Sequence, residues 1–340
     1  MISEVSDYPA GPVQAGVPYQ LLARDARHRW WRPLVALLVF AVLAFVLLLV
    51  AMLVLAAFVL YPAGFGDVRI AALVRDPESV EALVRDPFVL LFVSFGALVS
   101  LIPAAVLTAL WVQRRSPRQL IGVTGRFRRR WSAECLLAAL AVFAVAFAVS
   151  ALLTWITGGS FGPGFPGWAD YGRVALLALV VVPVQSAAEE FAFRGFLLQA
   201  VSAWFRTPWP AIALTSLLFL LGHGYTDPLV WCQLLVMAVS MCWLVVRTGG
   251  LEAAIALHVV NNSLSLLVGG LGGVPGIEQA GDFPVGDVLP FIAAILAYAW
   301  WVDRRAARRG AWNVTGGRVE LRPWSLRPAT QDDLRPEVSG

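Results

Sequence analysis

Long apolar runs recur along this chain. Several extend for about 18 residues or more, the length at which a run is interpreted as a transmembrane helix. The composition agrees, because 59% of the residues are hydrophobic and 14% are charged, whereas soluble proteins average about 25% charged residues. At 340 residues there is room for roughly eight spans of about 20 residues with short loops. We therefore predict an all-α fold, a polytopic transmembrane helical bundle of about eight spans.

The bounds of the spans follow from the apolar runs and the polar residues between them. They cover residues 34–60, 88–112, 132–156, 173–205, 208–223, 229–246, 251–268 and 285–302. Pro103 should kink the second span and Pro183 should bend the fourth, because proline lacks the backbone donor. We expect a cytoplasmic tail over 1–33, one bundle over 34–302, and a disordered polar cytoplasmic tail over 303–340.

The net charge of +4 is carried by arginine, because the chain contains no lysine. Arginines are frequent in the two tails and in the 113–130 segment, and are absent from 157–172 and 269–284. By the positive-inside rule, both termini should be cytoplasmic. Since the arginines flank apolar segments, we do not expect nucleic-acid binding. The arginine-only usage is typical of a bacterial chain, so we expect an integral protein of a bacterial cell membrane.

Two adjacent carboxylates lie inside the fourth apolar segment, and an ionisable group in hydrocarbon marks a functional site by default. Glu190 and Arg194 are four residues apart on a helix, so they share a face and can form a buried ion pair. Glu189 is rotated by about 100° from Glu190 and can point into a cavity. We predict that Glu190 and Arg194 are supporting residues and that Glu189 is the reactive carboxylate. The alternative is a structural ion pair between helices.

Two of the three histidines also lie in apolar segments. His223 ends the fifth span, four residues after Phe219, and alone it is more typical of a hydrogen-bonded helix end. His258 and Asn262 are four residues apart in the seventh span, so their side chains share a helix face. A histidine and an asparagine can together donate hydrogen bonds to a developing oxyanion. The alternative role is a polar contact between helices.

The depths of these residues can be compared from the helical rise. Counted from the ends of their spans, Glu189 and His258 both lie in the cytoplasmic half of the membrane. His223 does not, because it lies near the outer end of span five. We therefore expect span five to begin below the inner surface or to be steeply tilted, and residues 224–228 to be buried in protein.

Three strings taken together resemble the CPBP family of membrane proteins, which comprises CAAX prenyl proteases and bacteriocin-processing proteins and is also called Abi. The strings are Glu189-Glu190-x-x-x-Arg194 followed by Gly195, then Phe219-x-x-x-His223, then His258-x-x-x-Asn262. The lead-in Arg247-Thr248-Gly249-Gly250-Leu251 is also similar to the family's approach to its last motif. The family-like core is expected over about 174–268.

The resemblance implies an eight-helix bundle with a cavity open to the cytoplasm and an intramembrane endopeptidase activity. It implies that Glu189 and His223 activate a water and that His258 and Asn262 stabilise the oxyanion, with Glu190 and Arg194 supporting them. Family members are generally described as metalloproteases. One divalent metal, zinc by preference, could be held by Glu189, His223 and His258. A metal-free glutamate–histidine site is the other possibility.

Three functions compete at this point. The first is hydrolysis of a membrane-associated peptide or lipidated-protein substrate. The second is a non-catalytic bacteriocin-immunity or scaffold protein of the same fold, in which substitution of Glu189 and His223 would leave the phenotype intact. The third is a transporter, because buried carboxylate–histidine sets also serve as proton relays. An internal repeat would favour a transporter, and none is evident. The endopeptidase is the favoured prediction.

Overall fold

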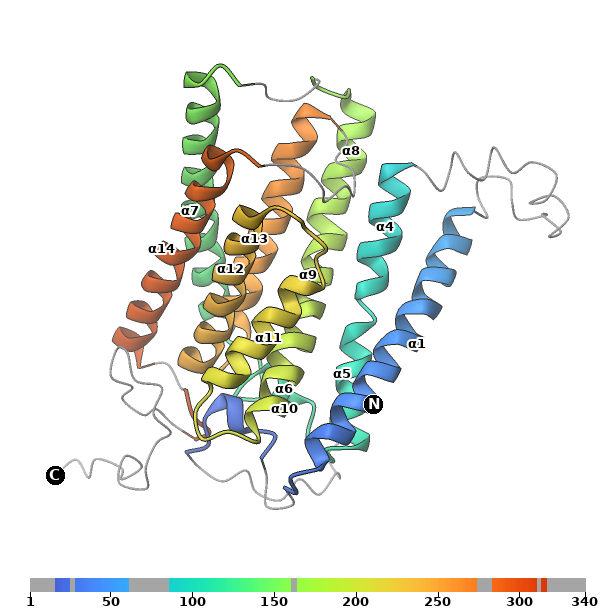
Figure 1. The fold of residues 1–340 in the computed structure, drawn as a ribbon, viewed down its shortest axis with the longest axis vertical. Helices are drawn as coiled ribbons and strands as arrows, with labels where there is room; N and C mark the ends of the chain where they lie inside the picture. The colour runs from blue at the N-terminus through green and yellow to red at the C-terminus, as the bar shows by residue number, and fades with distance from the viewer. Residues whose placement is uncertain are drawn as a thin grey trace, which may run out of the picture.

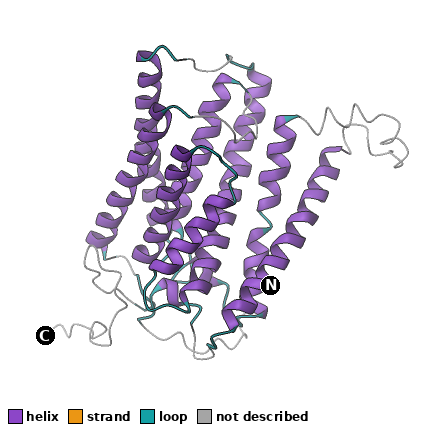
Figure 2. Ribbon diagram, in the orientation of Figure 1, coloured by secondary structure: helices purple, strands orange, loops and turns teal. Residues whose placement is uncertain are grey.

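The chain forms a bundle of long helices in the computed structural model, which describes residues 16–24, 28–60, 86–159, 164–273, 283–310 and 313–316. The described residues contain helices, turns and two isolated bridges (Figures 1 and 2). The main helices, in chain order, are α1 (Arg32–Leu60), α4 (Pro87–Leu98), α5 (Leu101–Trp111), α6 (Arg118–Ile121), α7 (Arg129–Ile156), α8 (Trp168–Leu176), α9 (Val182–Glu190), α10 (Leu198–Ser202), α11 (Trp209–Leu221), α12 (Pro228–Thr248), α13 (Glu252–Gly269) and α14 (Val285–Arg309).

Seven helical segments in the described part of the chain are long and apolar enough to cross a membrane. Many of their apolar side chains face outwards. On α1, for example, Leu38, Phe45 and Leu53 are each more than 60% exposed. Such continuous apolar exposure suits contact with lipid and is unusual for a soluble surface. The prediction of an all-α polytopic membrane bundle is confirmed, and the protein is an integral membrane protein.

The predicted fifth span corresponds to α11, which is shorter than the seven spanning segments. Its 13 residues extend only about 20 Å, less than the ~30 Å hydrocarbon core. In Figure 1 α11 runs obliquely across its neighbours, and the turn that joins it to α12 lies well below the upper ends of α7 and α8. The predicted tilt of span five is therefore observed, and the turn at its end is brought to mid-height in the bundle.

Two of the spanning segments are interrupted. The second breaks at Val99–Ser100 between α4 and α5, just before Pro103, as expected for a proline within the first turn of a helix. The fourth is helical from Trp168 to Ser202, but it contains two wider π-helical turns, over Leu177–Val181 and Phe191–Leu197. The first of these turns ends two residues before Pro183, where the predicted bend falls. Inserted π turns are frequent at functional sites.

The lower end of the bundle in Figure 1 is closed by short segments from distant parts of the chain. The turn between α12 and α13 pairs with the residues after α6, through Val123 N–H to Gly249 C=O and Leu251 N–H to Ile121 C=O. Residues 16–24 pack beneath α10, and Tyr19 there is fully buried. These contacts fix the height of α13 against the fourth segment, which is what places the polar side chains described next.

The apolar core lies mainly between α7, α12, α13 and α14, whose buried side chains form one cluster. A second cluster joins α1 and α5 to the π turn Phe191–Leu197. The fourth segment therefore lies between two apolar layers. A polar group on it is shielded from lipid on both sides.

Candidate active site

Glu190, Arg194 and His258 form the centre of a buried polar cluster. Arg194 Nη1 donates to Glu190 Oε1 at 2.8 Å, and His258 Nδ1 lies 2.7 Å from the same oxygen. All three side chains are at most 1% exposed. The predicted ion pair between Glu190 and Arg194 is present, and it also joins α9 to α13 through His258. The histidine contact to Glu190 was not predicted.

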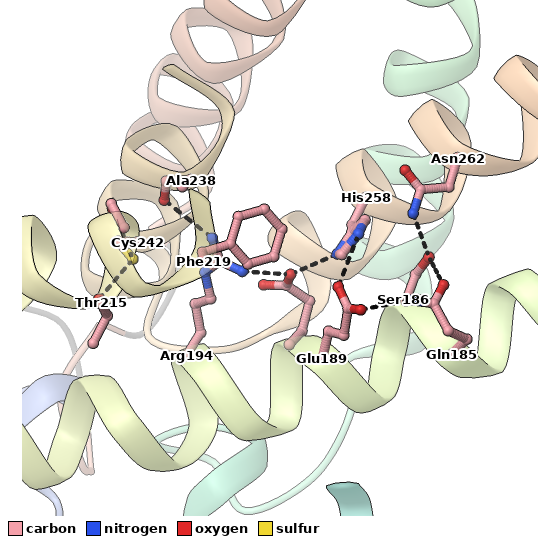
Figure 3. A network of polar contacts seen from close by, with 12 residues as sticks. Gln185, Ser186, Glu189, Arg194, Thr215, Phe219, Ala238, Cys242, His258 and Asn262 are labelled. Carbon is pink, nitrogen blue, oxygen red and sulfur yellow. Dashed lines mark hydrogen bonds and ion pairs between the residues drawn. The ribbon is translucent and has the colours of Figure 1, made fainter. Parts of the chain in front are cut away.

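Glu189 points to the other edge of the same imidazole (Figure 3). Its Oε2 lies 3.5 Å from His258 Nε2, and its Oε1 accepts a 2.7 Å hydrogen bond from Gln185 Nε2. Among the described residues Oε2 has no hydrogen-bond partner, although its side chain is only 10% exposed. The two adjacent glutamates thus face opposite nitrogens of one histidine, as their rotation around the helix requires.

The π turn that follows Glu190 sets the direction of Arg194. The Arg194 guanidinium lies 4.5 Å from the centre of the Phe219 ring on α11. Its Nη2 donates to the carbonyl of Ala238 on α12 at 3.3 Å. Gly195 allows the turn to approach the end of α6, because a Cβ there would lie 3.1 Å from the carbonyl oxygen of Leu120. The arginine is therefore held by a carboxylate, a carbonyl and an aromatic face, with little freedom to move.

His223 lies just beyond α11 and close to the cluster. Its Nδ1 is 2.7 Å from the Phe219 carbonyl oxygen, and its ring lies 4.4 Å from the Phe219 ring. The Phe219 ring is in turn 5.7 Å from that of His258. The side chain is partly exposed, with Nε2 free of the Phe219 contact. The tilt of α11 thus brings His223 next to Phe219, whose ring also contacts that of His258.

The expectation that residues 224–228 are buried in protein is wrong for most of that segment. Gly224, Thr226 and Pro228 are exposed, Tyr225 is half-buried, and only Asp227 is buried. The tilt and shortness of α11 give His223 its depth without burial of the turn that follows it.

Asn262 is on the same face of α13 as His258, as predicted, but it contacts a different partner. Its Nδ2 lies 3.4 Å from Ser186 Oγ, and its Oδ1 accepts a 2.8 Å hydrogen bond from Asn261. Figure 3 shows Asn262 above Ser186, on the side of Glu189 that lies away from Arg194. The side chains of His258 and Asn262 therefore both face α9.

The three proposed metal ligands do not form a ready metal site. No group of three His, Cys, Asp or Glu side chains within the described ranges is close enough to hold a metal ion. Glu189 Oε2 and His258 Nε2 face each other and could share one ion, but His223 does not complete a group of three with them. The donor set in this arrangement does not fit a three-residue zinc centre.

Gln185 is the site residue that sequence reasoning missed. It lies four residues before Glu189 and one turn away on the same helix, a spacing at which polar side chains meet. That signal was present in the sequence. The bond from Glu190 to His258 could not be found in this way, because it joins residues 68 apart in the chain.

The fold and the site together define a membrane-embedded helical protein with a buried glutamate–histidine cluster. Residues 171–264 match the family model described as type II CAAX prenyl endopeptidase Rce1-like. The resemblance predicted from the three strings is therefore confirmed over this segment, and at the level of the family it is that of a CAAX protease-like intramembrane peptidase.

A Bacillus subtilis (strain 168) protein described as uncharacterized protein YyaK is 27% identical to this chain over 189 residues. The match covers 54% of this chain and 62% of the relative, so the chain spans less than two thirds of that protein. No solved structure gives a significant match.

Proposed function

We propose that this protein is an intramembrane endopeptidase that hydrolyses a peptide bond in a membrane-associated substrate. The observation that carries the proposal is the pair of carboxylates flanking one imidazole. Glu190 is paired with both Arg194 and His258 Nδ1, while the Oε2 of Glu189 lies 3.5 Å from His258 Nε2 and accepts no hydrogen bond among the described residues. A buried carboxylate oxygen that accepts no hydrogen bond suits a base that holds a water.

Glu189 and His223 would activate the water. Glu189 Oε2 accepts one of its protons, and the oxygen then forms a bond to the carbonyl carbon of the substrate. His223 contacts the Phe219 ring, which in turn contacts His258, and its Nε2 would hold the same water from the side of α11. The proton taken by Glu189 passes to the leaving amine nitrogen as the C–N bond breaks. Atoms and charge then balance over one turnover.

His258 and Asn262 would stabilise the oxyanion of the tetrahedral intermediate. Glu190 Oε1 is a carboxylate acceptor 2.7 Å from His258 Nδ1, so Nδ1 would carry a proton, and donation from Nε2 to an oxyanion would then require the imidazolium form. That form balances the charge of the cluster, because Glu189, Glu190, Arg194 and a protonated His258 sum to zero. A neutral cluster is far less costly to bury than one with an uncompensated charge. Asn262 Nδ2 would supply the second donor.

Peptide cleavage by the purified protein in detergent tests the proposal. Wild type and Glu189→Ala would be compared on a library of apolar and prenylated peptides, with Glu134→Ala as the control. Glu134 is a carboxylate on α7 that pairs with Arg305 and Arg309 away from the site. We expect Glu189→Ala to lower kcat by about 10²–10⁴-fold and Glu134→Ala to leave it unchanged. Full activity in Glu189→Ala would exclude the proposed role of Glu189, whereas absence of cleavage by the wild type across the library would favour a non-catalytic protein of the same fold.

Metal analysis of the same preparation separates the two mechanisms. Because the donor set does not fit a three-residue centre, the proposed route uses only side chains, and we expect cleavage to persist after dialysis against a chelator. One tightly held zinc per chain, with activity lost on its removal and restored on its return, would contradict the metal-free route. It would instead assign Glu189, His223 and His258 as ligands.

We also propose that both termini face the cytoplasm. Residues 16–18 are hydrogen-bonded to residues 314–315, so the two described terminal segments lie at one end of the bundle. The arginine-rich residues before α7 begin at that same end (Figure 1). Positive residues gather on the cytoplasmic side of membrane proteins. Reporter fusions at the two termini would test the orientation, and both should report the cytoplasm.

A further inference from the structure

Gln185 is a buried amide whose main partner lies on its own helix. Its side chain is in the α9 turn before Glu189, and the residue is 3% exposed. Nε2 donates to Glu189 Oε1 at 2.7 Å. Because both residues belong to α9, this hydrogen bond joins no two helices. It fixes the direction of the glutamate side chain, and with it the position of Oε2.

The amide of Gln185 is itself held by a series of hydrogen bonds that all run in one direction (Figure 3). Asn261 Nδ2 donates to Asn262 Oδ1, Asn262 Nδ2 donates to Ser186 Oγ, and Ser186 Oγ donates to Gln185 Oε1. The amide oxygens of Asn262 and Gln185 each accept, so the amide nitrogen of each is turned towards the next residue. The series ends on Glu189. Hydrogen bonds in such a chain polarise and strengthen one another.

We propose that Gln185 is a positioning residue, which holds Glu189 with Oε2 facing His258 and the reacting water, and which is itself oriented by Ser186 and Asn262. This inference rests on the proposed function. It assigns a role to a residue that touches neither water nor substrate. It also links the residues that activate water to those that stabilise the oxyanion, because Asn262 is proposed to stabilise the oxyanion and also orients Gln185 through Ser186.

The physical reason is the freedom of a glutamate side chain. Glutamate has three rotatable side-chain bonds, and a carboxylate that rotates away from its reacting partner loses catalytic alignment. A displacement of about 1 Å can lower a rate by about 10²-fold. Gln185 restricts Glu189 through one oxygen and leaves the other for chemistry. Glu190, at the other edge of the His258 ring, is restricted in the same way, because Arg194 and His258 both contact its Oε1.

Steady-state kinetics of Gln185→Met test the inference. Methionine has a similar length and volume but cannot donate. We expect kcat to fall by about 10–100-fold and KM to change by less than about twofold, because substrate contacts are untouched. Gln199→Met is the matched control. Gln199 is also fully buried on the fourth segment, but it bonds Arg115 and the Gln119 carbonyl. Its substitution should lower stability and leave the kcat of the folded protein intact.

A double-variant comparison separates positioning from a general structural effect. In a Glu189→Asp background the carboxylate is withdrawn by one methylene, so the bond to Gln185 is already lost. Adding Gln185→Met should then lower kcat by less than about twofold, since coupled residues are not additive. If the two losses in kcat multiply, Gln185 does not act through Glu189, and the inference is overturned. Should Gln185→Met fail to fold, Gln185→Asn, which is too short to reach Oε1, serves in its place with the same expectation.

The outcomes also separate this inference from the proposed function. Retained cleavage in Glu189→Ala would remove the proposed function and the inference together. Loss of cleavage in Glu189→Ala, with wild-type kcat in Gln185→Met and Gln185→Asn, would overturn the inference alone. A large rise in KM with unchanged kcat would also overturn it, because that result would place Gln185 in substrate binding.

Discussion

Glu190 accepts hydrogen bonds from two cationic or polar partners on different helices, so it determines whether the cluster holds together. Arg194 and His258 both contact its Oε1. Charges buried this deeply are tolerated because opposite charges compensate each other. Removing one of them leaves another charge buried without a partner, which lowers the stability of the fold. The carboxylate of Glu189 depends on this balance although it is bonded to neither Glu190 nor Arg194.

The first prediction concerns Arg194. Arg194→Met leaves the Glu190 charge without its guanidinium, and we expect the free energy of unfolding to fall by about 3–5 kcal/mol. Arg305→Met is the control, because Arg305 pairs with Glu134 while its side chain is 39% exposed. Exposed pairs contribute about 1 kcal/mol or less. Denaturant unfolding in detergent measures both variants. Equal losses for the two would show that the buried pair is no more important than a surface pair.

At the scale of single elements, Asp227 fixes the start of α12. Its Oδ1 accepts from Leu229 N–H and its Oδ2 accepts from Phe283 N–H, just before α14. The hydrogen bond from Phe283, together with those from the α12 N-terminus, lowers the pKa of the Asp227 carboxyl. This one side chain therefore joins the turn that follows His223 to the start of another helix.

The second prediction follows from the sign of that shift. A carboxyl whose pKa is lower in the folded state stabilises the fold above its ordinary pKa of about 3.9, and the contribution is lost as pH falls through the lower, folded value. Asp227→Ala should therefore lower Tm at pH 7, and its difference from wild type should shrink in acid. Asp227→Asn keeps one acceptor oxygen and should lose less at pH 7, and its difference from wild type should also shrink in acid, because asparagine does not titrate. Thermal unfolding in detergent between pH 3 and 7 measures this, and a constant difference would contradict it.

The third prediction concerns the contact between the α6 turn and the α12–α13 turn. A Cβ at Gly122 would lie 2.8 Å from the backbone oxygen of Gly249, which cannot move aside easily. Gly122→Ala should separate the two turns and lower both stability and activity, because α13 carries His258. Gly172→Ala is the control, since a Cβ there meets no atom within 4 Å. Unfolding and peptide cleavage assays on both variants test the difference. Wild-type behaviour of Gly122→Ala would contradict it.

The helices could be predicted from the sequence, since apolar length alone fixes where a chain can cross a membrane. The spans at 132–156 and 285–302, for example, correspond to α7 and α14 to within a few residues at most ends. The π turns could not be predicted, because nothing in Phe191–Leu197 distinguishes it from an α-helical sequence. In the site, i and i+4 spacing gave the Glu190–Arg194 pair. Contacts between helices, such as Glu190 to His258, depend on packing that no local pattern encodes.

For the whole molecule, the terminal segments close one end of the bundle and contact the site from below. Tyr19 donates its hydroxyl proton to the Leu120 carbonyl at 2.7 Å, and the Arg194 carbonyl oxygen lies 3.3 Å from the same hydroxyl oxygen as a second acceptor. Val17 and Thr315 then join the N-terminal segment to the C-terminal one. Residues more than 170 positions apart are thus coupled through one phenol. The π turn that carries Arg194 is supported by the N-terminal segment.

The fourth prediction tests that support. Burial raises the pKa of Tyr19 far above its ordinary value, so the hydroxyl stays a neutral donor at any working pH. Tyr19→Phe keeps the ring but leaves the Leu120 carbonyl buried without its donor, which should cost about 1–3 kcal/mol. Tyr225→Phe, at a half-buried position in the α11–α12 turn, should change stability by less than about 0.5 kcal/mol. If Tyr19→Phe is as stable as Tyr225→Phe, the N-terminal segment rests on the bundle without supporting it. If it is less stable and also slower in cleavage, the terminal segment helps to hold Arg194, and through Glu190 the imidazole that faces the substrate.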